Sequence, residues 1–359
     1  MNVLKKNIIN FEEACFGIDL GDLFVKIVEL ESNGSQDFVR AYSIAAIPEG
    51  SIEDGRIIDK QKVTQAIKTA ISVAEPKKIN TKKVICSLPE SKVFLRVLSI
   101  PKMEKAEIGE AIKWEIEASI PLSVDQVYYD WQLIGEVEGK QNILTVAISR
   151  EIVDDILEVL EGAGLEVYGL EAESVVATRS LINNSDEKGK VSLVVDLGSK
   201  RTNFIVTEGN IPFFTSSIPF SSDGVTDAIA KTLGVGNEEA QKLKISQGVG
   251  SCDNDDSVFN SMRSYLEGLS VEIEKTIDFY QNINSQSGKV EEIIICGGAN
   301  LKGLVPYLAK RLGQKIYIGD PWTNLNFGGR LPIISKEKAL QFTNAIGLAM
   351  RKKDYENRN

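Results

Sequence analysis

The sequence predicts a two-lobed α/β protein with a duplicated core. A strand, a tight Asp-Leu-Gly turn and a returning strand occur at residues 16–31 and again at 194–208, about half the chain apart. Each copy is followed by a third β-rich run, a helix and, later, a short apolar strand. A chain of 359 residues is also longer than one hydrophobic core usually organises. These observations favour two related halves, each forming one lobe.

The first half contains the elements expected of one such lobe. The strands of the first copy are followed by a β-rich run at 38–47. Apolar residues at helical spacing from Val63 to Ala74 predict a helix, for which Asp59 is a suitable N-cap. The apolar run 84–88 then predicts a buried strand.

Residues 89–169 are predicted to form an insertion with an α+β pattern of its own. Its expected elements alternate between strands and amphipathic helices, namely a strand at 93–99, a helix at 108–116, strands at 127–134 and 143–149, and a helix at 152–160. Ile120-Pro121 ends the first of these helices. The insertion therefore separates the first-lobe core into two segments.

The second half carries an additional helical segment. A helix from Asp223 to Gly234 and a long apolar stripe from Met262 to Tyr280 precede a short strand at 293–296. The sequence therefore divides into a first-lobe core (1–88 and 170–190), the insertion (89–169), a second-lobe core (191–222 and 291–350), a helical subdomain (223–290) and a polar tail (351–359).

Composition excludes several kinds of chemistry. The chain has no histidine, which removes histidine bases and histidine metal ligands. Lys and Arg number 41 against 51 Asp and Glu, and the formal net charge of −10 argues against a nucleic-acid partner. The four cysteines form no C-x-x-C pair, and no signal peptide or membrane-spanning run is evident. We therefore expect a cytoplasmic protein without direct membrane insertion.

The two Asp-Leu-Gly turns carry the main functional signal. Gly21 and Gly198 each follow a buried-type strand, where backbone N–H groups can donate to phosphate oxygens. Asp19 and Asp196 can hold Mg²⁺ through water, and Lys26 can place a point charge on the phosphates. One such turn alone is more typical of an ordinary hairpin. Two copies in matching contexts favour a phosphate site.

A third motif lies where the late apolar strand ends in Gly297-Gly298 before a helix with Pro306 in its first turn. Adjacent glycines let a ribose or a flat ring approach the backbone closely, which suits an adenosine site, although an ordinary strand-to-helix connection explains the motif equally well. The chain has no G-x-x-x-x-G-K-[ST] motif and no complete dinucleotide turn.

Together the three motifs resemble the phosphate 1, phosphate 2 and adenosine motifs of the actin-like superfamily, which includes Hsp70-type chaperones and sugar kinases. Within it the chain most resembles the PilM family of type IV pilus assembly proteins, and next the cell-division protein FtsA. Similar stretches include 16–21, 25–30, 100–103, 114–122 and 345–349. The resemblance implies a duplicated actin-like (ribonuclease H-like) fold, with an FtsA/PilM-type subdomain 1C at 89–169 and a helical subdomain 2B.

The resemblance also implies ATP and Mg²⁺ as ligands and assigns site residues. Asp19 and Asp196 would orient the waters of Mg²⁺, and Glu171 and Asp196 would position the attacking water. The nucleotide would contact Gly21, Asp22, Lys26, Gly198, Ser199, Lys200, Gln241, Lys244, Gly297, Gly298 and Asn300. Two alternatives without a role in nucleotide binding stay open. In one, Glu171 is only a carboxylate at a helix N-terminus, and in the other, Gln241 and Lys244 lie on a solvated helix face.

Three positions depart from the family pattern. Asp22 stands where many relatives have Ser or Thr, Gln241 replaces the usual Glu, and Ser221-Ser222 stands where the pilus family usually shows Gly-Gly. These departures leave nucleotide binding as the expectation. They leave hydrolysis open, at most as a weak ATPase activity.

The function that the resemblance implies is an ATP-binding scaffold of a type IV pilus, or of a related secretion or competence system. It would bind the short cytoplasmic N-terminal segment of a PilN-like membrane protein, which would recruit it to the inner face of the cytoplasmic membrane. Pilus motor ATPases and self-association are further candidate interactions. An FtsA-like membrane-tethering filament is the alternative, but residues 351–359 lack an amphipathic anchor. A small-molecule kinase is disfavoured by the insertion.

Overall fold

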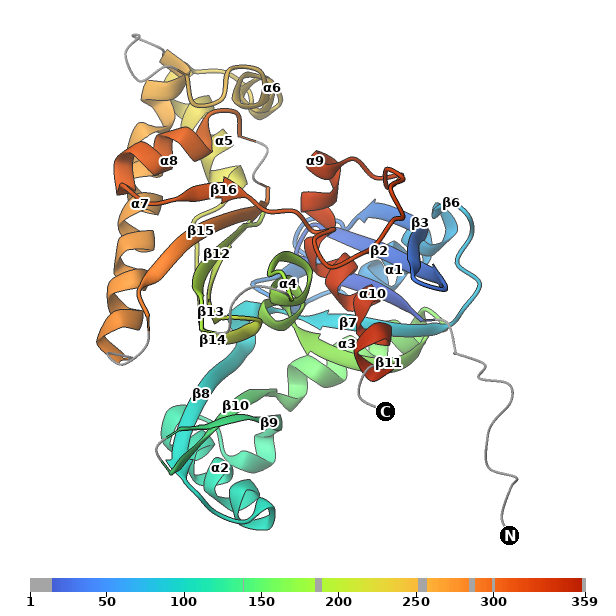
Figure 1. The fold of residues 1–359 in the computed structure, drawn as a ribbon. Helices are drawn as coiled ribbons and strands as arrows, with labels where there is room; N and C mark the ends of the chain where they lie inside the picture. Colours follow the sequence, from blue (N-terminus) through green and yellow to red (C-terminus); the bar gives the residue numbers. More distant parts are fainter. Residues whose placement is uncertain are drawn as a thin grey trace.

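The computed structural model describes residues 15–137, 139–184, 189–250, 257–283, 288–298 and 301–356. Two lobes, each built on a β-sheet, lie on either side of the central helices α4 (Glu173–Leu181) and α10 (Thr343–Glu356) (Figure 1). One sheet has six strands and the other has eight. The two-lobed α/β architecture predicted from the sequence is confirmed.

The first lobe contains the six-stranded sheet, in the order β11-β7-β1-β2-β3-β6. Its strands are β1 (Phe16–Leu20), β2 (Phe24–Asn33), β3 (Gln36–Ala46), β6 (Glu75–Pro76), β7 (Lys83–Leu88) and β11 (Glu166–Ala172). The strand β1 is antiparallel to β2 and parallel to β7. Helix α1 (Lys60–Ser72) covers this sheet and begins as predicted, because the Asp59 carboxylate accepts the Lys62 amide at 3.0 Å.

The second lobe repeats this arrangement. Its meander consists of β12 (Val191–Leu197), β13 (Thr202–Glu208) and β14 (Ile211–Ile218), and β12 also pairs in parallel with β15 (Val290–Gly297). The order β15-β12-β13-β14 therefore matches β7-β1-β2-β3 of the first lobe. The duplication predicted from the two turns is present in the sheet topology.

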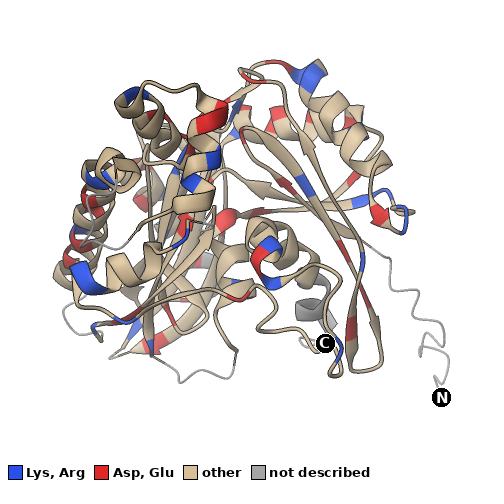
Figure 2. Cartoon of the chain, turned by 90° about the horizontal axis from the view of Figure 1, so that it is seen from above, with Lys and Arg blue, Asp and Glu red and all other residues tan. Residues whose placement is uncertain are grey.

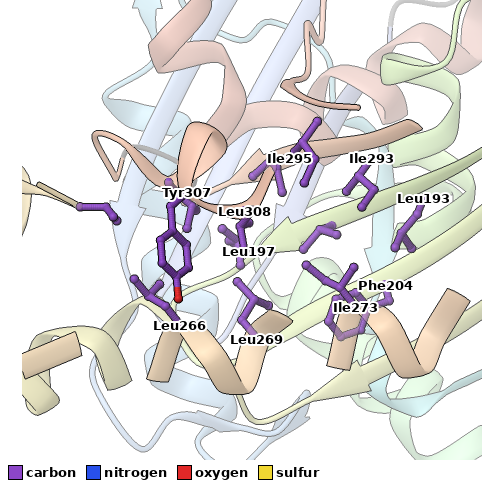
Figure 3. Packing of buried hydrophobic residues seen from close by; sticks show 14 of the residues in the cluster. Leu193, Leu197, Phe204, Leu266, Leu269, Ile273, Ile293, Ile295, Tyr307 and Leu308 are labelled. Carbon is purple, nitrogen blue, oxygen red and sulfur yellow. The ribbon is translucent and has the colours of Figure 1, made fainter. Parts of the chain in front are cut away.

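Helices α5 (Ser222–Leu233), α6 (Asn237–Gln247), α7 (Ser257–Ile283) and α8 (Leu304–Leu312) complete the second lobe, together with the edge strand β16 (Ile316–Ile318). The long helix α7 packs its apolar stripe on the sheet. In Figure 3, Leu269 and Ile273 of α7 face the sheet residues Leu193, Phe204 and Ile293, all of which are buried. Each such side chain contributes about 1.5–3 kcal/mol when it leaves water.

The insertion forms a separate small layer with its own core. It contains β8 (Val93–Pro101), α2 (Lys105–Ser119), β9 (Val127–Val137) and β10 (Lys140–Ser149). Ile112 and Ile116 of α2 pack against Ile143 of β10. The next helix, α3 (Arg150–Gly162), belongs by packing to the first lobe, because its residues Ile152, Ile156 and Leu160 join the core cluster around α1. The 89–169 range expected from the sequence therefore includes one helix of the first-lobe core.

The insertion is also joined to the second lobe. Strand β8 pairs with the edge strand β14 at Arg96 and Phe214, so that the second-lobe sheet continues into the insertion in the order β14-β8-β10-β9. Strand β8, which follows the first-lobe strand β7 in the chain, therefore lies against β14 of the second lobe.

The central helices cross between the lobes (Figure 1). Ala177 and Leu181 of α4 pack with Val194 and Ile294 of the second-lobe sheet. Helix α10 instead packs on the first-lobe sheet, where a Cβ on Gly17 would overlap the carbonyl oxygen of Ala345. Residues 343–350, assigned to the second-lobe core from sequence, thus contact the first lobe.

The surface carries charges of both signs. Figure 2 shows Lys and Arg interspersed with Asp and Glu over the helices of both lobes. Among the described helices, none combines the length and apolar character needed to cross a bilayer.

Candidate functional site

A cavity of about 460 Å³ lies between the two lobes. Residues from both Asp-Leu-Gly turns line it, together with the end of β15 and one face of α6. The sequence-predicted residues that it brings together are Asp19, Gly21, Asp22, Lys26, Asp196, Gly198, Ser199, Lys200, Gln241, Lys244, Gly297 and Gly298. Asn300 lies outside the described residues.

The two turns have equivalent geometry. The Gly21 amide donates to the carbonyl of Phe24 at 3.1 Å, and the Gly198 amide donates to the carbonyl of Arg201 at 2.9 Å. In the first turn Asp19 lies opposite Lys26 on the returning strand. In the second, Asp196 lies opposite Asn203. Asn203 also lines the cavity, and superposing the two sequence repeats identifies it as the counterpart of Lys26.

The first turn places an ion pair at the centre of the cavity. Lys26 Nζ lies 3.1 Å from Asp19 Oδ2, and the Ser87 hydroxyl donates to Asp19 Oδ1 at 3.1 Å. Burial alone would lower the pKa of Lys26, but the carboxylates of Asp19, Asp196 and Glu173 outweigh it and raise that pKa. Lys26 is therefore firmly protonated.

Asp196 of the second turn also lines the cavity. Burial raises its pKa, the positive charge of Lys26 opposes this rise, and Asp19 adds to it. The carboxylates thus outnumber the cations at this point. Such an excess of negative charge attracts a cation.

Glu171 does not reach the cavity. Arg179 holds its carboxylate in a bidentate pair at 2.6 and 3.0 Å, and Arg351 Nε lies 3.3 Å from it. The reason is that β11 continues to Ala172, so Glu171 still projects as a strand residue toward α4 and α10.

Glu173, the first residue of α4, is the carboxylate that lines the cavity instead. Its Oε2 accepts the Asn203 side-chain amide at 2.9 Å and the Glu90 backbone amide at 3.4 Å. Burial raises the pKa of Glu173 well above its ordinary value, and Asp19, Glu90 and Asp196 raise it further. The sequence motif Leu-Glu-Ala-Glu contains both glutamates, and only the helix start distinguishes them.

On the α6 side, Lys244 is buried among neutral partners. Its ammonium donates to the carbonyl and hydroxyl of Ser222, both at 2.9 Å, and to the Thr226 hydroxyl at 2.8 Å. The Thr226 hydroxyl in turn donates to Gln241 Oε1 at 2.8 Å. Burial lowers the pKa of Lys244, and Asp223 and Asp227 oppose this shift. Buried Lys244 and exposed Gln241 are therefore joined through the Thr226 hydroxyl at the cavity wall.

Gly297, the last residue of β15, and Gly298 leave a wall of bare backbone. Gly297 has φ 71° and a Cβ there would overlap the Asp196 carboxylate. A Cβ on Gly298 would lie 2.7 Å from the carbonyl oxygen of Leu197. Ser221 caps helix α5 by accepting the Gly224 amide at 3.1 Å.

Ion pairs bridge the lobes at the mouth of the cavity. Arg201 of the second turn lies 3.0 Å from Asp54 of the first lobe, and Lys200 lies 3.4 Å from Glu49. Asp22 Oδ1 accepts the Gly55 amide at 3.1 Å. Burial raises the pKa of Asp22, the Gly55 hydrogen bond lowers it and Asp54 raises it again. The sequence did not single out Arg201, because its partner is remote along the chain.

The family model described as "Type IV pilus assembly protein PilM" matches residues 17–353. The chain belongs to the PilM family. The solved "PilM-PilN type IV pilus biogenesis complex" contains a chain that is 26% identical and covers 95% of this chain and 98% of its own, with a TM-score of 0.80. The resemblance to PilM and the actin-like fold class are thereby confirmed.

The chain is also similar, at lower identity, to two further proteins. FtsA from Streptococcus pneumoniae is 22% identical over 255 residues, which cover 65% of this chain and 55% of that FtsA. MreB 5 of Spiroplasma citri bound to AMPPNP is 13% identical and has a TM-score of 0.55, covering 97% of this chain and 99% of MreB. The MreB comparison shows a shared fold. The match to this FtsA spans little more than half of the FtsA length.

Proposed function

We propose that the chain is an ATP-binding scaffold of a type IV pilus assembly platform, with the nucleotide held in the cavity between the lobes. The observation that supports it most is the equivalence of the two turns, which face one cavity from opposite lobes. Gly21 and Gly198 close these turns and place the next residues, Asp22, Ser199 and Lys200, along the cavity wall. Backbone amides arranged in this way, with Lys26 beside them, suit phosphate oxygens.

The residues present also fit Mg²⁺. Asp19, Asp196 and Glu173 line the cavity beside Lys26, and carboxylate oxygens are the ligands that Mg²⁺ prefers. Within the described ranges no three ligating side chains converge on one point, so the carboxylates would hold Mg²⁺ through its waters. When bound, Mg²⁺ would neutralise phosphate charge. Asp19 and Asp196 would hold its waters.

Hydrolysis, where it occurs, would use Glu173 in the role that the sequence gave to Glu171. Its carboxylate is fixed by Asn203 across the lobes and lies among the cavity residues. Its raised pKa favours accepting a hydrogen bond and a proton from water. The chain holds no histidine to assist, so we propose at most a weak ATPase.

Calorimetric titration with ATP in the presence and absence of Mg²⁺ tests the nucleotide proposal. We expect saturable binding that Mg²⁺ strengthens. Asp196→Asn should weaken Mg²⁺-dependent binding about tenfold, or about 1.4 kcal/mol, and leave Mg²⁺-free binding nearly unchanged. Asp320→Asn, in an exposed second-lobe pair with Lys336, is the matched control. Absence of saturable binding to the folded wild-type chain contradicts the proposal.

We also propose that the chain binds the cytoplasmic N-terminal segment of a PilN-like membrane protein and is thereby held at the inner face of the cytoplasmic membrane. The similarity to a PilM chain solved in a PilM-PilN complex, over 95% of this chain, supports this. Titration with such a peptide and with a scrambled peptide tests it. Equal affinities for both contradict it.

An FtsA-like membrane-tethering filament is the second candidate, and the 22% identity to FtsA is the observation behind it. Flotation with lipid vesicles separates the two proposals. Vesicle binding by the chain alone supports the filament function, whereas vesicle binding that requires a PilN-like partner supports the scaffold.

A further inference from the structure

The point where the chain leaves the first lobe for the insertion lies beside the start of α4 at the cavity. The chain leaves at Pro89 and the short helical turn Glu90–Lys92, which we call the neck. It re-enters the first lobe at α3 and then runs through β11 into α4, whose first residue is Glu173. Pro89, Glu90 and Glu173 all line the cavity between the lobes. The path into the insertion is therefore in contact with the nucleotide site proposed above.

Two hydrogen bonds join the neck to the start of α4, one to the Glu173 carboxylate and one from the backbone of the next residue, Ser174. The Glu90 amide donates to Glu173 Oε2 at 3.4 Å, and the Ser174 amide at the start of α4 donates to Glu90 Oε2 at 2.8 Å. Glu90 is only 4% exposed, although it carries a carboxyl group. Because Glu173 Oε2 also accepts Asn203 of the second lobe, the pair connects three parts of the molecule.

The groups that shift the pKa of Glu90 do not include a cation that would pair with its buried carboxylate. Burial raises its pKa, the Thr215 hydroxyl and the Ser174 groups oppose the rise, and Asp196 adds to it. A buried carboxyl without a cation costs stability. Its hydrogen bond to the start of α4 is the compensating contact that the geometry shows.

The neck also touches the second lobe. Thr215, beside Glu90, lies on β14, and β14 pairs with β8 at Arg96 shortly after the neck. A change in the separation of the lobes therefore acts on the neck from the β14 side, while a change at Glu173 acts on it from the α4 side. This arrangement gives the insertion two contacts with the cavity walls.

We propose that Glu90 is a positioning residue, which fixes Glu173 at the cavity and thereby couples the insertion to the state of that cavity. This inference rests on the proposed nucleotide site and adds the route by which its occupancy reaches the insertion. The physical requirement is that the Glu90 contact with Ser174 differs between the empty and the occupied cavity.

Hydrogen–deuterium exchange of the full chain, with and without ATP and Mg²⁺, tests the inference. In the wild type we expect nucleotide to change exchange at the two turns and also at residues 89–101, which cover the neck and β8. In Glu90→Ala, the change at 89–101 should fall about threefold or more, while the turns still respond. Glu90→Gln keeps an acceptor for the Ser174 amide and should retain most of the wild-type response.

The matched control is Glu29→Gln. Glu29 is a buried first-lobe carboxylate, 3% exposed, but its partner is Arg40 and it does not line the cavity. A wild-type response confined to the turns overturns the inference and needs no variant that folds poorly. An unchanged neck response in folded Glu90→Ala, or an equal loss in Glu29→Gln, also overturns it. No response at the turns contradicts nucleotide binding itself.

Discussion

Gly297 provides the most direct test of how the backbone wall serves the cavity. Its φ of 71° is unfavourable for alanine by about 1–2 kcal/mol. A methyl group at this position would also overlap the Asp196 carboxylate and lie 2.7 Å from the carbonyl oxygen of Leu197. Both of these groups belong to the second turn, so Gly297→Ala must displace Asp196 from the cavity.

Gly313 separates the two effects. It has nearly the same backbone conformation, with φ 63°, and nothing lies within 4 Å of the position that its Cβ would occupy. Gly313→Ala should therefore reduce stability by about 1 kcal/mol through backbone strain alone. Gly297→Ala should lose at least as much stability, and should also weaken Mg²⁺-dependent ATP binding about tenfold or more, which is about 1.4 kcal/mol.

Calorimetric titration and denaturant unfolding of the two variants measure these effects. The reasoning is refuted if folded Gly297→Ala binds ATP as Gly313→Ala does. Equal binding would mean that Asp196 moves without consequence, and that the close approach at Gly297 is only a feature of chain folding. Weak binding by both variants would instead point to a general loss of second-lobe structure.

Two further predictions concern carboxylates. Glu292, 2% exposed, is held by Lys190, Lys315 and Tyr317. Burial raises the pKa of Glu292, but these partners outweigh burial and lower the pKa from 4.5 to about 2. The ionised Glu292 carboxylate therefore stabilises the fold above pH 4.5, and this stabilisation is lost as the pH falls toward 2. In denaturant unfolding, Glu292→Gln should lower the free energy of unfolding by about 2 kcal/mol at pH 7 and approach the wild type near pH 2. A difference in unfolding free energy that stays constant with pH contradicts this prediction. ATP turnover by the wild type, where measurable, should fall at least tenfold in Glu173→Gln, and this variant should still bind nucleotide. Glu171→Gln should lower the stability of the fold and leave turnover per folded molecule unchanged. The opposite pattern would return the water-positioning role to Glu171.

The elements that depend on local pattern were predictable from sequence. The two turns, the Asp59 cap and the stripe of α7 follow from residue spacing within short windows, and the structure contains each of them. The convergence of both turns on one cavity also followed, because equivalent turns in a duplicated fold face each other.

The features that were not predictable depend on contacts distant in sequence. The placement of α10 on the first lobe requires close approach at Gly17, more than 300 residues earlier in the chain. The pairing of β8 with β14 joins an insertion of one lobe to the edge of the other. Glu173 was missed in favour of Glu171 because an uncertainty of two residues at the helix start decides which glutamate faces the cavity.

The difference between Lys26 and Asn203 bears on the proposed Mg²⁺ site. The two residues occupy equivalent positions opposite Asp19 and Asp196. A lysine in both would bring two cations to the carboxylates Asp19, Asp196 and Glu173 and would reduce their attraction for Mg²⁺. Asn203 instead donates an uncharged hydrogen bond to Glu173, which fixes that carboxylate across the lobes without neutralising it. One lysine and one asparagine therefore keep the contact between the lobes without adding a second positive charge beside the carboxylates.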